Sequence, residues 1–179
     1  MATEAAPTPS RELRGAAILA DPLVSELLEG RLVGVLATLE ADGTVHAVPM
    51  WLAAGEGAIL LATGSRSRKV RNLERDPRAT LVLHDSRPGF EVCGASIRGR
   101  VEIVRGEEAA PLVERVHRRY VTEAGERLPA AAEFLASDDV ALRLVPEAAV
   151  TWDERDSPAA TALRAAGAAL PLEPTEPRG

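Results

Sequence analysis

Short strand-like runs, separated by turns that contain glycine, fill the first half of the sequence. Residues 31–39, 44–53 and 58–63 have the largely apolar composition of strands that pack on a core. Gly43 follows Ala-Asp and can supply the positive φ of a tight hairpin turn, and Gly57 lies in a second turn. We therefore expect three consecutive antiparallel strands, arranged as a meander.

The rest of the chain continues this pattern, with helices inserted between strands rather than alternating with them. Further strands are expected at residues 78–84, 90–104, 139–145 and 149–153, and helices at 22–29, 66–76, 107–121 and 129–136. Gly94 and Gly99 interrupt the run 90–104, as at bulges or close backbone contacts. This order disfavours a parallel, doubly wound sheet. It predicts a mainly β fold with added helices (α+β), built on a six- to seven-stranded antiparallel barrel.

The domain organisation follows from composition. A chain of 179 residues, 46% of them apolar, suits one globular domain. Residues 1–20 are rich in Ala, Pro and Thr and are expected to form a loose arm, which ends where Asp21 can cap a helix. We place the barrel domain at residues 21–153. Residues 154–179 are expected to form an Ala- and Pro-rich tail with a peripheral helix.

Charge and cysteine content argue against several classes of protein. The formal net charge of −6 argues against broad binding to nucleic acid or to acidic membranes. No apolar run reaches the length of a membrane span, and residues 1–10 lack the pattern of a secretion signal. Cys93 is the only cysteine, which excludes an intrachain disulfide and a cysteine metal cluster, and we expect a small buried side chain rather than a nucleophile. A cytoplasmic protein without a metal site fits these features.

The strongest chemical signal is a basic segment at a strand-to-helix junction, residues 63–72. Lys69, the only lysine among twenty-one basic residues, lies here among several arginines. Cations are unfavourable at a helix N-terminus, which already carries partial positive charge, so an anion is expected beside them. Five side chains could bind a terminal phosphate: Thr63, Ser67, Arg68 and Lys69, with Arg71 one turn further on. A solvated basic helix in an arginine-rich chain is the alternative.

Other polar and aromatic residues leave their roles open. His46 lies on the second expected strand and either faces a ligand or is structural. His84 and His117 have no acid, base or metal partner at a diagnostic spacing, so we expect both to be structural. Trp152 either covers a ligand or anchors the core. Since no serine triad, paired carboxylates or Gly-rich nucleotide motif is present, no catalytic residue is assigned.

The order of these motifs resembles the pyridoxamine 5′-phosphate oxidase-like superfamily of split β-barrels, which bind flavins and deazaflavins. The resemblance spans about residues 21–153. The matching segments are a leading helix, residues 34–39, 42–51, Thr63, 67–73, 76–81, 97–101 and 142–146, and Trp152. Each segment is weak alone, but the order in which they occur is specific. The resemblance implies an FMN-binding type of split barrel.

The resemblance also implies a homodimer with a small-molecule cofactor at the subunit interface. The cofactor phosphate would lie on Thr63, Ser67, Arg68 and Lys69. The strand around residues 46–51 would run along the ring of the cofactor. Its contact residues would be His46, Val48, Pro49, Met50 and Trp51.

The chain departs from true pyridoxamine-phosphate oxidases after Trp152, where it lacks their arginine–histidine pair. We therefore expect a different organic substrate. The arginine-rich form of residues 67–78 looks more like the branch that uses the 8-hydroxy-5-deazaflavin coenzyme F-420, which we favour slightly over FMN. The predicted function is an oxidoreductase that transfers hydride to or from a small organic substrate. A non-catalytic carrier of flavin, deazaflavin or haem is the alternative.

Overall fold

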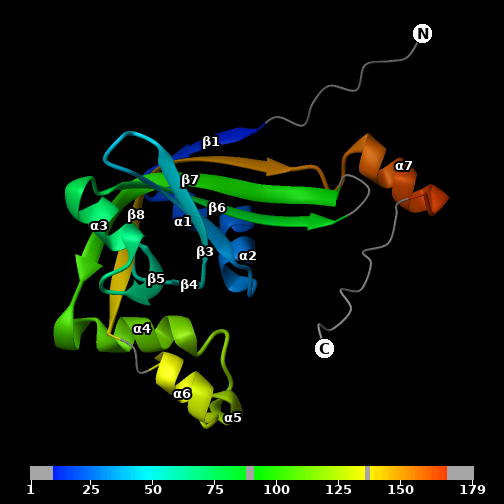
Figure 1. Cartoon of the computed structure of the whole chain (residues 1–179). Helices are drawn as coiled ribbons and strands as arrows, with labels where there is room; N and C mark the ends of the chain where they lie inside the picture. The colour runs from blue at the N-terminus through cyan, green and yellow to red at the C-terminus, as the bar shows by residue number, and fades with distance from the viewer. Residues whose placement is uncertain (1–9, 88–90, 136–137, 169–179) are drawn as a thin grey trace.

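The computed structural model describes residues 10–87, 91–135 and 138–168, which form one curled antiparallel sheet with helices around it (Figure 1). The strands are β1 (Arg11–Arg14), β2 (Gly34–Leu39), β3 (Val45–Met50), β4 (Leu52–Ala54), β5 (Ile59–Gly64), β6 (Arg78–Arg87), β7 (Glu91–Val104) and β8 (Asp139–Asp153). The helices are α1 (Ala17–Ala20), α2 (Pro22–Glu29), α3 (Arg68–Arg75), α4 (Ala110–His117), α5 (Glu123–Glu126), α6 (Pro129–Leu135) and α7 (Pro158–Ala166), with a 3-10 turn at Gly106–Glu108.

The strands follow the order β3-β2-β6-β7-β8-β5-β4, and β1 adds to β8. Every recorded pairing is antiparallel. The two ends of this path, β3 and β4, are consecutive in the chain and are separated only by Trp51. The sheet therefore curls until its ends approach each other, and the predicted split barrel is confirmed.

The two hairpins of the predicted meander form, but its middle strand is not continuous. Residues 44–53 were expected to form one strand, but the run breaks at Trp51 into β3, which pairs with β2, and β4, which pairs with β5. Strand β5 then pairs with β8, more than seventy residues further along the chain. Local alternation specifies that a run is extended, but it does not specify which strand lies beside it.

Two boundaries also differ from the sequence-based expectation. Residues 11–20, assigned to a loose arm, form β1 and α1; Ile18 is fully buried and Leu13 packs against the core. Residues 139–153, expected as two pieces, form the single strand β8. The sheet accommodates this length through a register shift, since Arg98 pairs with Ala148 but Gly99 pairs with Pro146. Residues 1–9 and 169–179 of the expected arm and tail lie outside the described residues.

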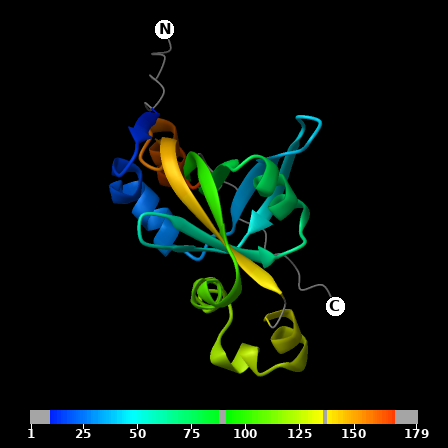
Figure 2. The same ribbon diagram turned by 90° about the vertical axis from the view of Figure 1, so that its left-hand side faces the viewer.

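The core fills the inside of the curl. Alternate residues of β2, β6 and β7, such as Leu36, Leu81 and Ile97, are buried, and α2 contributes Val24 and Leu27. Helix α2 begins at Asp21, whose side chain accepts hydrogen bonds from the N–H groups of Leu23 and Val24, as a capping residue does. Helices α4, α5 and α6 form a separate layer at one end of the barrel (Figure 2), where α4 contacts β5 and β8. No described helix combines the length and apolar composition of a membrane span.

Candidate functional site

The start of α3 brings together three of the residues expected to bind phosphate. Thr63 lies near the end of β5, and Ser67 occupies the N-cap position of α3. The Nζ atom of Lys69 donates a hydrogen bond to Oγ1 of Thr63 over 2.9 Å, and Oγ1 of Thr63 lies 3.4 Å from Oγ of Ser67. Ser67 makes no capping hydrogen bond with its side chain, so its hydroxyl can serve a ligand.

Lys69 is an unusual cation because its side chain is only partly exposed. Burial lowers the pKa of its ammonium group from the ordinary lysine value, since desolvation disfavours the charged form. The carboxylate of Asp139 opposes this shift by stabilising the positive charge. An anion placed on Lys69 would stabilise the ammonium further.

A hollow of about 460 Å³ opens beside Lys69 and its hydrogen-bond partner. It is lined by residues 49–51, residues 62–64, His117 and Asp139. The backbone at Gly64 is open to a ligand: the atom nearest to a Cβ there would be Oδ1 of Asp139, at 3.9 Å. The lining thus combines the Thr63 hydroxyl with a flat aromatic wall at Trp51, and Lys69 and Ser67 are hydrogen-bonded to that hydroxyl.

The structure adds two residues that the sequence did not single out for this site. His117, expected to be structural, ends α4, and Asp139 begins β8; Nε2 of His117 lies 3.5 Å from Oδ2 of Asp139. Their side chains are 8% and 9% exposed, so the pair is almost fully buried at the wall of the hollow. The residues are 22 positions apart in sequence, and only the pairing of Asp139 with Gly64 places the carboxylate here.

The C-terminal end of α4 is fixed to the barrel through Tyr120 and Arg119. The Tyr120 hydroxyl donates to the carbonyl of Leu32 over 2.6 Å and accepts from the N–H of Leu52 over 3.2 Å. Arg119 donates to carbonyls at the end of α2. The ring of Trp51 stacks on Tyr120 at 4.9 Å and meets His117 edge-on at 6.2 Å. These contacts hold Trp51 in place as a wall of the hollow.

Replacing Tyr120 with phenylalanine tests this anchoring. We expect the free energy of unfolding to fall by about 1–3 kcal/mol, because the carbonyl of Leu32 and the N–H of Leu52 lose a partner while the aromatic stack is kept. Urea denaturation followed by tryptophan fluorescence measures the change. Arg127→Gln, which alters only an exposed ion pair with Glu123, serves as the control. An unchanged urea midpoint in Tyr120→Phe would contradict the anchoring role.

The other two predicted phosphate contacts, Arg68 and Arg71, have different partners. Nη1 of Arg68 is 3.7 Å from Oε1 of Glu40, and the Arg68 side chain is 64% exposed. Nη1 of Arg71 donates to the carbonyl of Arg66 over 2.7 Å. Both belong to the first turn of α3, but successive helical residues point about 100° apart, so they do not share the direction of Lys69.

Only some of the residues expected to contact the cofactor ring line the hollow. Pro49, Met50 and Trp51 line the hollow, whereas His46 and Val48 do not. The carbonyl of His46 accepts a hydrogen bond from Thr38, and Val48 packs against the core. Both precede the break at Trp51, which turns the chain out of β3.

The remaining sequence candidates occupy other parts of the barrel. Cys93 is buried, and desolvation raises the pKa of its thiol. Trp152 pairs with Gly94 across β7 and β8, and its ring covers the face of that glycine. Among the described residues, no group of three or more His, Cys, Asp or Glu side chains could hold a metal ion.

Comparison with protein families gives one decisive match. The family model described as pyridoxamine 5′-phosphate oxidase matches residues 20–164, which is most of the chain. The chain belongs to this family. Its split barrel is therefore that of a pyridoxamine 5′-phosphate oxidase-like protein. No curated protein matches the chain.

Solved structures of family-like proteins share the fold. A conserved hypothetical protein, Rv2991 from Mycobacterium tuberculosis, is 30% identical with a TM-score of 0.64, covering 80% of this chain and 91% of that one. A protein described as an F420 reductase is 25% identical with a TM-score of 0.54, covering 70% and 94%. HutZ, the heme storage protein from Vibrio cholerae, is 19% identical with a TM-score of 0.56, covering 71% and 89%, and shows the fold alone.

Proposed function

We propose that this pyridoxamine 5′-phosphate oxidase-like protein is an oxidoreductase that binds a deazaflavin or flavin coenzyme in the hollow beside Lys69. Thr63, Ser67 and Lys69 hold the phosphate of the coenzyme, while Arg68 and Arg71 add positive charge nearby without sharing the direction of Lys69. The observation that carries this proposal is the partly buried ammonium of Lys69, which is hydrogen-bonded to Thr63 in the lining of an open hollow. The ring lies toward residues 49–51.

The donor set fits the anionic end of such a coenzyme. Two hydroxyl groups, an ammonium and the start of a helix provide hydrogen-bond donors and positive charge at one place. When bound, the coenzyme supplies hydride chemistry, and the protein supplies orientation and exclusion of water. We favour coenzyme F-420 slightly over FMN, because the surplus of arginine around α3 suits a more highly charged tail and because an F420 reductase is among the similar structures.

We further propose that the active protein is a homodimer, as the family resemblance implies. The hollow is open at its surface, and a second copy would cover the coenzyme from the outside. Light scattering on the purified full-length chain measures the mass. A monomer that still binds coenzyme tightly would contradict this part of the proposal.

Identification of the co-purifying small molecule, by absorbance spectrum and mass, is the direct test of the function. We then expect titration with FMN or coenzyme F-420 to saturate at one site per chain. The loaded protein should reduce members of a panel of quinones and enones. Tight binding without turnover of any acceptor would favour the carrier alternative, whereas binding of neither coenzyme would overturn both readings.

The single lysine allows the phosphate contact to be observed directly. Selective 13C labelling of lysine yields a signal from Lys69 alone, whose titration reports its pKa. We expect this pKa to lie below the ordinary lysine value in the free protein and to rise when FMN or coenzyme F-420 binds, because a nearby anion stabilises the charged form. Binding should accordingly weaken as the pH rises through that pKa. An unchanged titration in a sample whose absorbance shows bound coenzyme would contradict the contact.

A further inference from the structure

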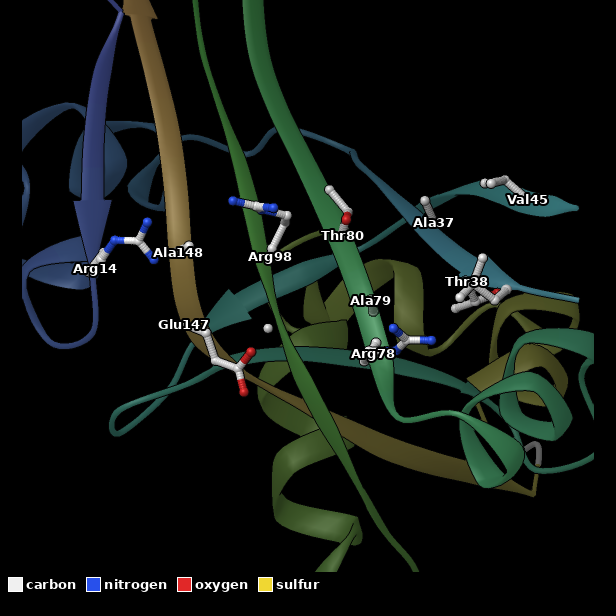
Figure 3. A pocket seen from close by; sticks show the side chains of 12 residues that line it. Arg14, Ala37, Thr38, Val45, Arg78, Ala79, Thr80, Arg98, Glu147 and Ala148 are labelled. Carbon is white, nitrogen blue, oxygen red and sulfur yellow. The ribbon is translucent and has the colours of Figure 1, made fainter. Parts of the chain in front are cut away.

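A second hollow, of about 490 Å³, lies on the face of the sheet opposite the core (Figure 3). It shares no lining residue with the hollow beside Lys69. Small side chains of β2, β6 and β8 form part of its lining, namely Ala37, Thr80 and Ala148. Three arginines also line it, Arg14 from β1, Arg78 from β6 and Arg98 from β7.

The strand register places two of these arginines on either side of one small residue. Arg14 pairs with Ala148 across β1 and β8, and Arg98 pairs with the same alanine across β7 and β8. Directly opposed residues of antiparallel strands share a face, and neighbouring strands are about 4.8 Å apart, so the two Cα atoms are separated by about 10 Å. Figure 3 shows both guanidinium groups reaching toward each other over Ala148, whose methyl group leaves the space between them open.

One carboxylate, that of Glu147, lines the same hollow as these two arginines. Within the described ranges, neither Arg14 nor Arg98 forms an ion pair or a side-chain hydrogen bond. Arg78 differs, since its guanidinium is paired with Asp76. Glu147 is the extra residue at the register shift, and its carboxylate points away from the two guanidinium groups in Figure 3. Both side chains are exposed, so water screens part of their mutual repulsion, and an anion between them would offset the rest.

We propose that Arg14 and Arg98 bind the phosphate or carboxylate group of a small molecule over Ala148. Each guanidinium offers a planar pair of N–H donors that matches an oxyanion, and Thr80 lies beside Arg98 on the neighbouring strand as a further polar contact. The apolar part of the ligand lies along Ala37 and Val45. The volume is in the range of small-molecule sites. This anion site is separate from the proposed coenzyme site and does not depend on it.

A titration with inorganic phosphate and with benzoate, in the Lys69→Ala variant, tests the proposal without a contribution from the first hollow. We expect saturable shifts in the Nε–Hε NMR signals of Arg14 and Arg98. Benzoate should bind with higher affinity than acetate, a carboxylate without a ring, because of the apolar lining. Arg98→Ala should weaken binding by about tenfold or more, and Arg98→Lys by less, because a lysine keeps the charge but loses the fork. Arg127→Gln removes an equal charge elsewhere and should leave binding unchanged.

Three results would overturn the proposal. One is the absence of saturable binding of either anion in the Lys69→Ala background. Another is an equal loss of affinity in Arg98→Ala and Arg127→Gln, which would indicate general electrostatic attraction. The third is a change of mass in light scattering when Arg98 is replaced, with no effect of phosphate, which would assign the two guanidinium groups to a carboxylate of a second copy of the chain.

Discussion

Lys69→Ala should lower the affinity for FMN or coenzyme F-420 by about 100-fold. The ammonium group is partly buried and bonded to Thr63, so a phosphate on it would gain charge-assisted hydrogen bonds that water screens poorly. Hydrogen bonds to charged groups contribute about 1.5–3 kcal/mol each, and about 2.7 kcal/mol corresponds to 100-fold in affinity. Fluorescence or absorbance titration of the purified variant measures the loss.

Three further variants sharpen this result. Lys69→Arg keeps the charge but replaces a compact ammonium with a planar fork, so we expect an intermediate affinity. Adding Arg68→Ala to the Lys69→Ala variant should lower the coenzyme affinity further, but by less than Lys69→Ala alone does, because Arg68 is mostly exposed and faces Glu40. Arg105→Gln is the matched control: it removes a cation that pairs with Glu74 of α3, and we expect the coenzyme affinity to stay unchanged. Wild-type affinity in Lys69→Ala would remove the proposed phosphate site, whatever the other variants show.

The basic segment was readable from sequence because its signal is local. Charges that oppose the helix dipole, next to hydroxyl residues and a glycine, indicate an anion without knowledge of any distant contact. Thr63, Ser67 and Lys69 lie together as expected, although their binding role remains a prediction. Arg68 and Arg71 were grouped with them by proximity in sequence, but the direction of a helical side chain changes with every residue.

His117 and Asp139 escaped the sequence analysis because their relation is set by long-range pairing. His117 reaches the hollow only when α4 packs on β5, and Asp139 does so only through its pairing with Gly64. One usable signal was present: His117 follows the core residue Val116 in a helix whose outer face is otherwise charged. The pairing of β5 with β8 is long-range in the same way, whereas the pairing of β5 with its sequence neighbour β4 was predicted.

Gly99→Ala should be the most damaging single substitution for stability among those considered. A Cβ at this position would overlap the carbonyl oxygen of Val145 and would lie 2.9 Å from its carbonyl carbon and 3.1 Å from Cα of Pro146. These are backbone atoms of β8 at the register shift, so no side-chain rotation can relieve the overlap. Strands β7 and β8 would have to separate at this register shift.

We expect Gly99→Ala to lower the free energy of unfolding by about 3 kcal/mol, the upper part of the usual cost of overpacking. For a chain of this size, such a loss lowers Tm by roughly 10 °C. Calorimetry or thermal circular dichroism measures it. Gly30→Ala is the matched control, because its φ of −60° suits alanine and its nearest contacts would be 3.4 Å away. Since alanine also restricts the unfolded chain, that control should be neutral or slightly stabilising. Equal Tm values for the two variants would show that β7 and β8 can separate at the register shift without cost, so the glycine would not be needed for their close approach.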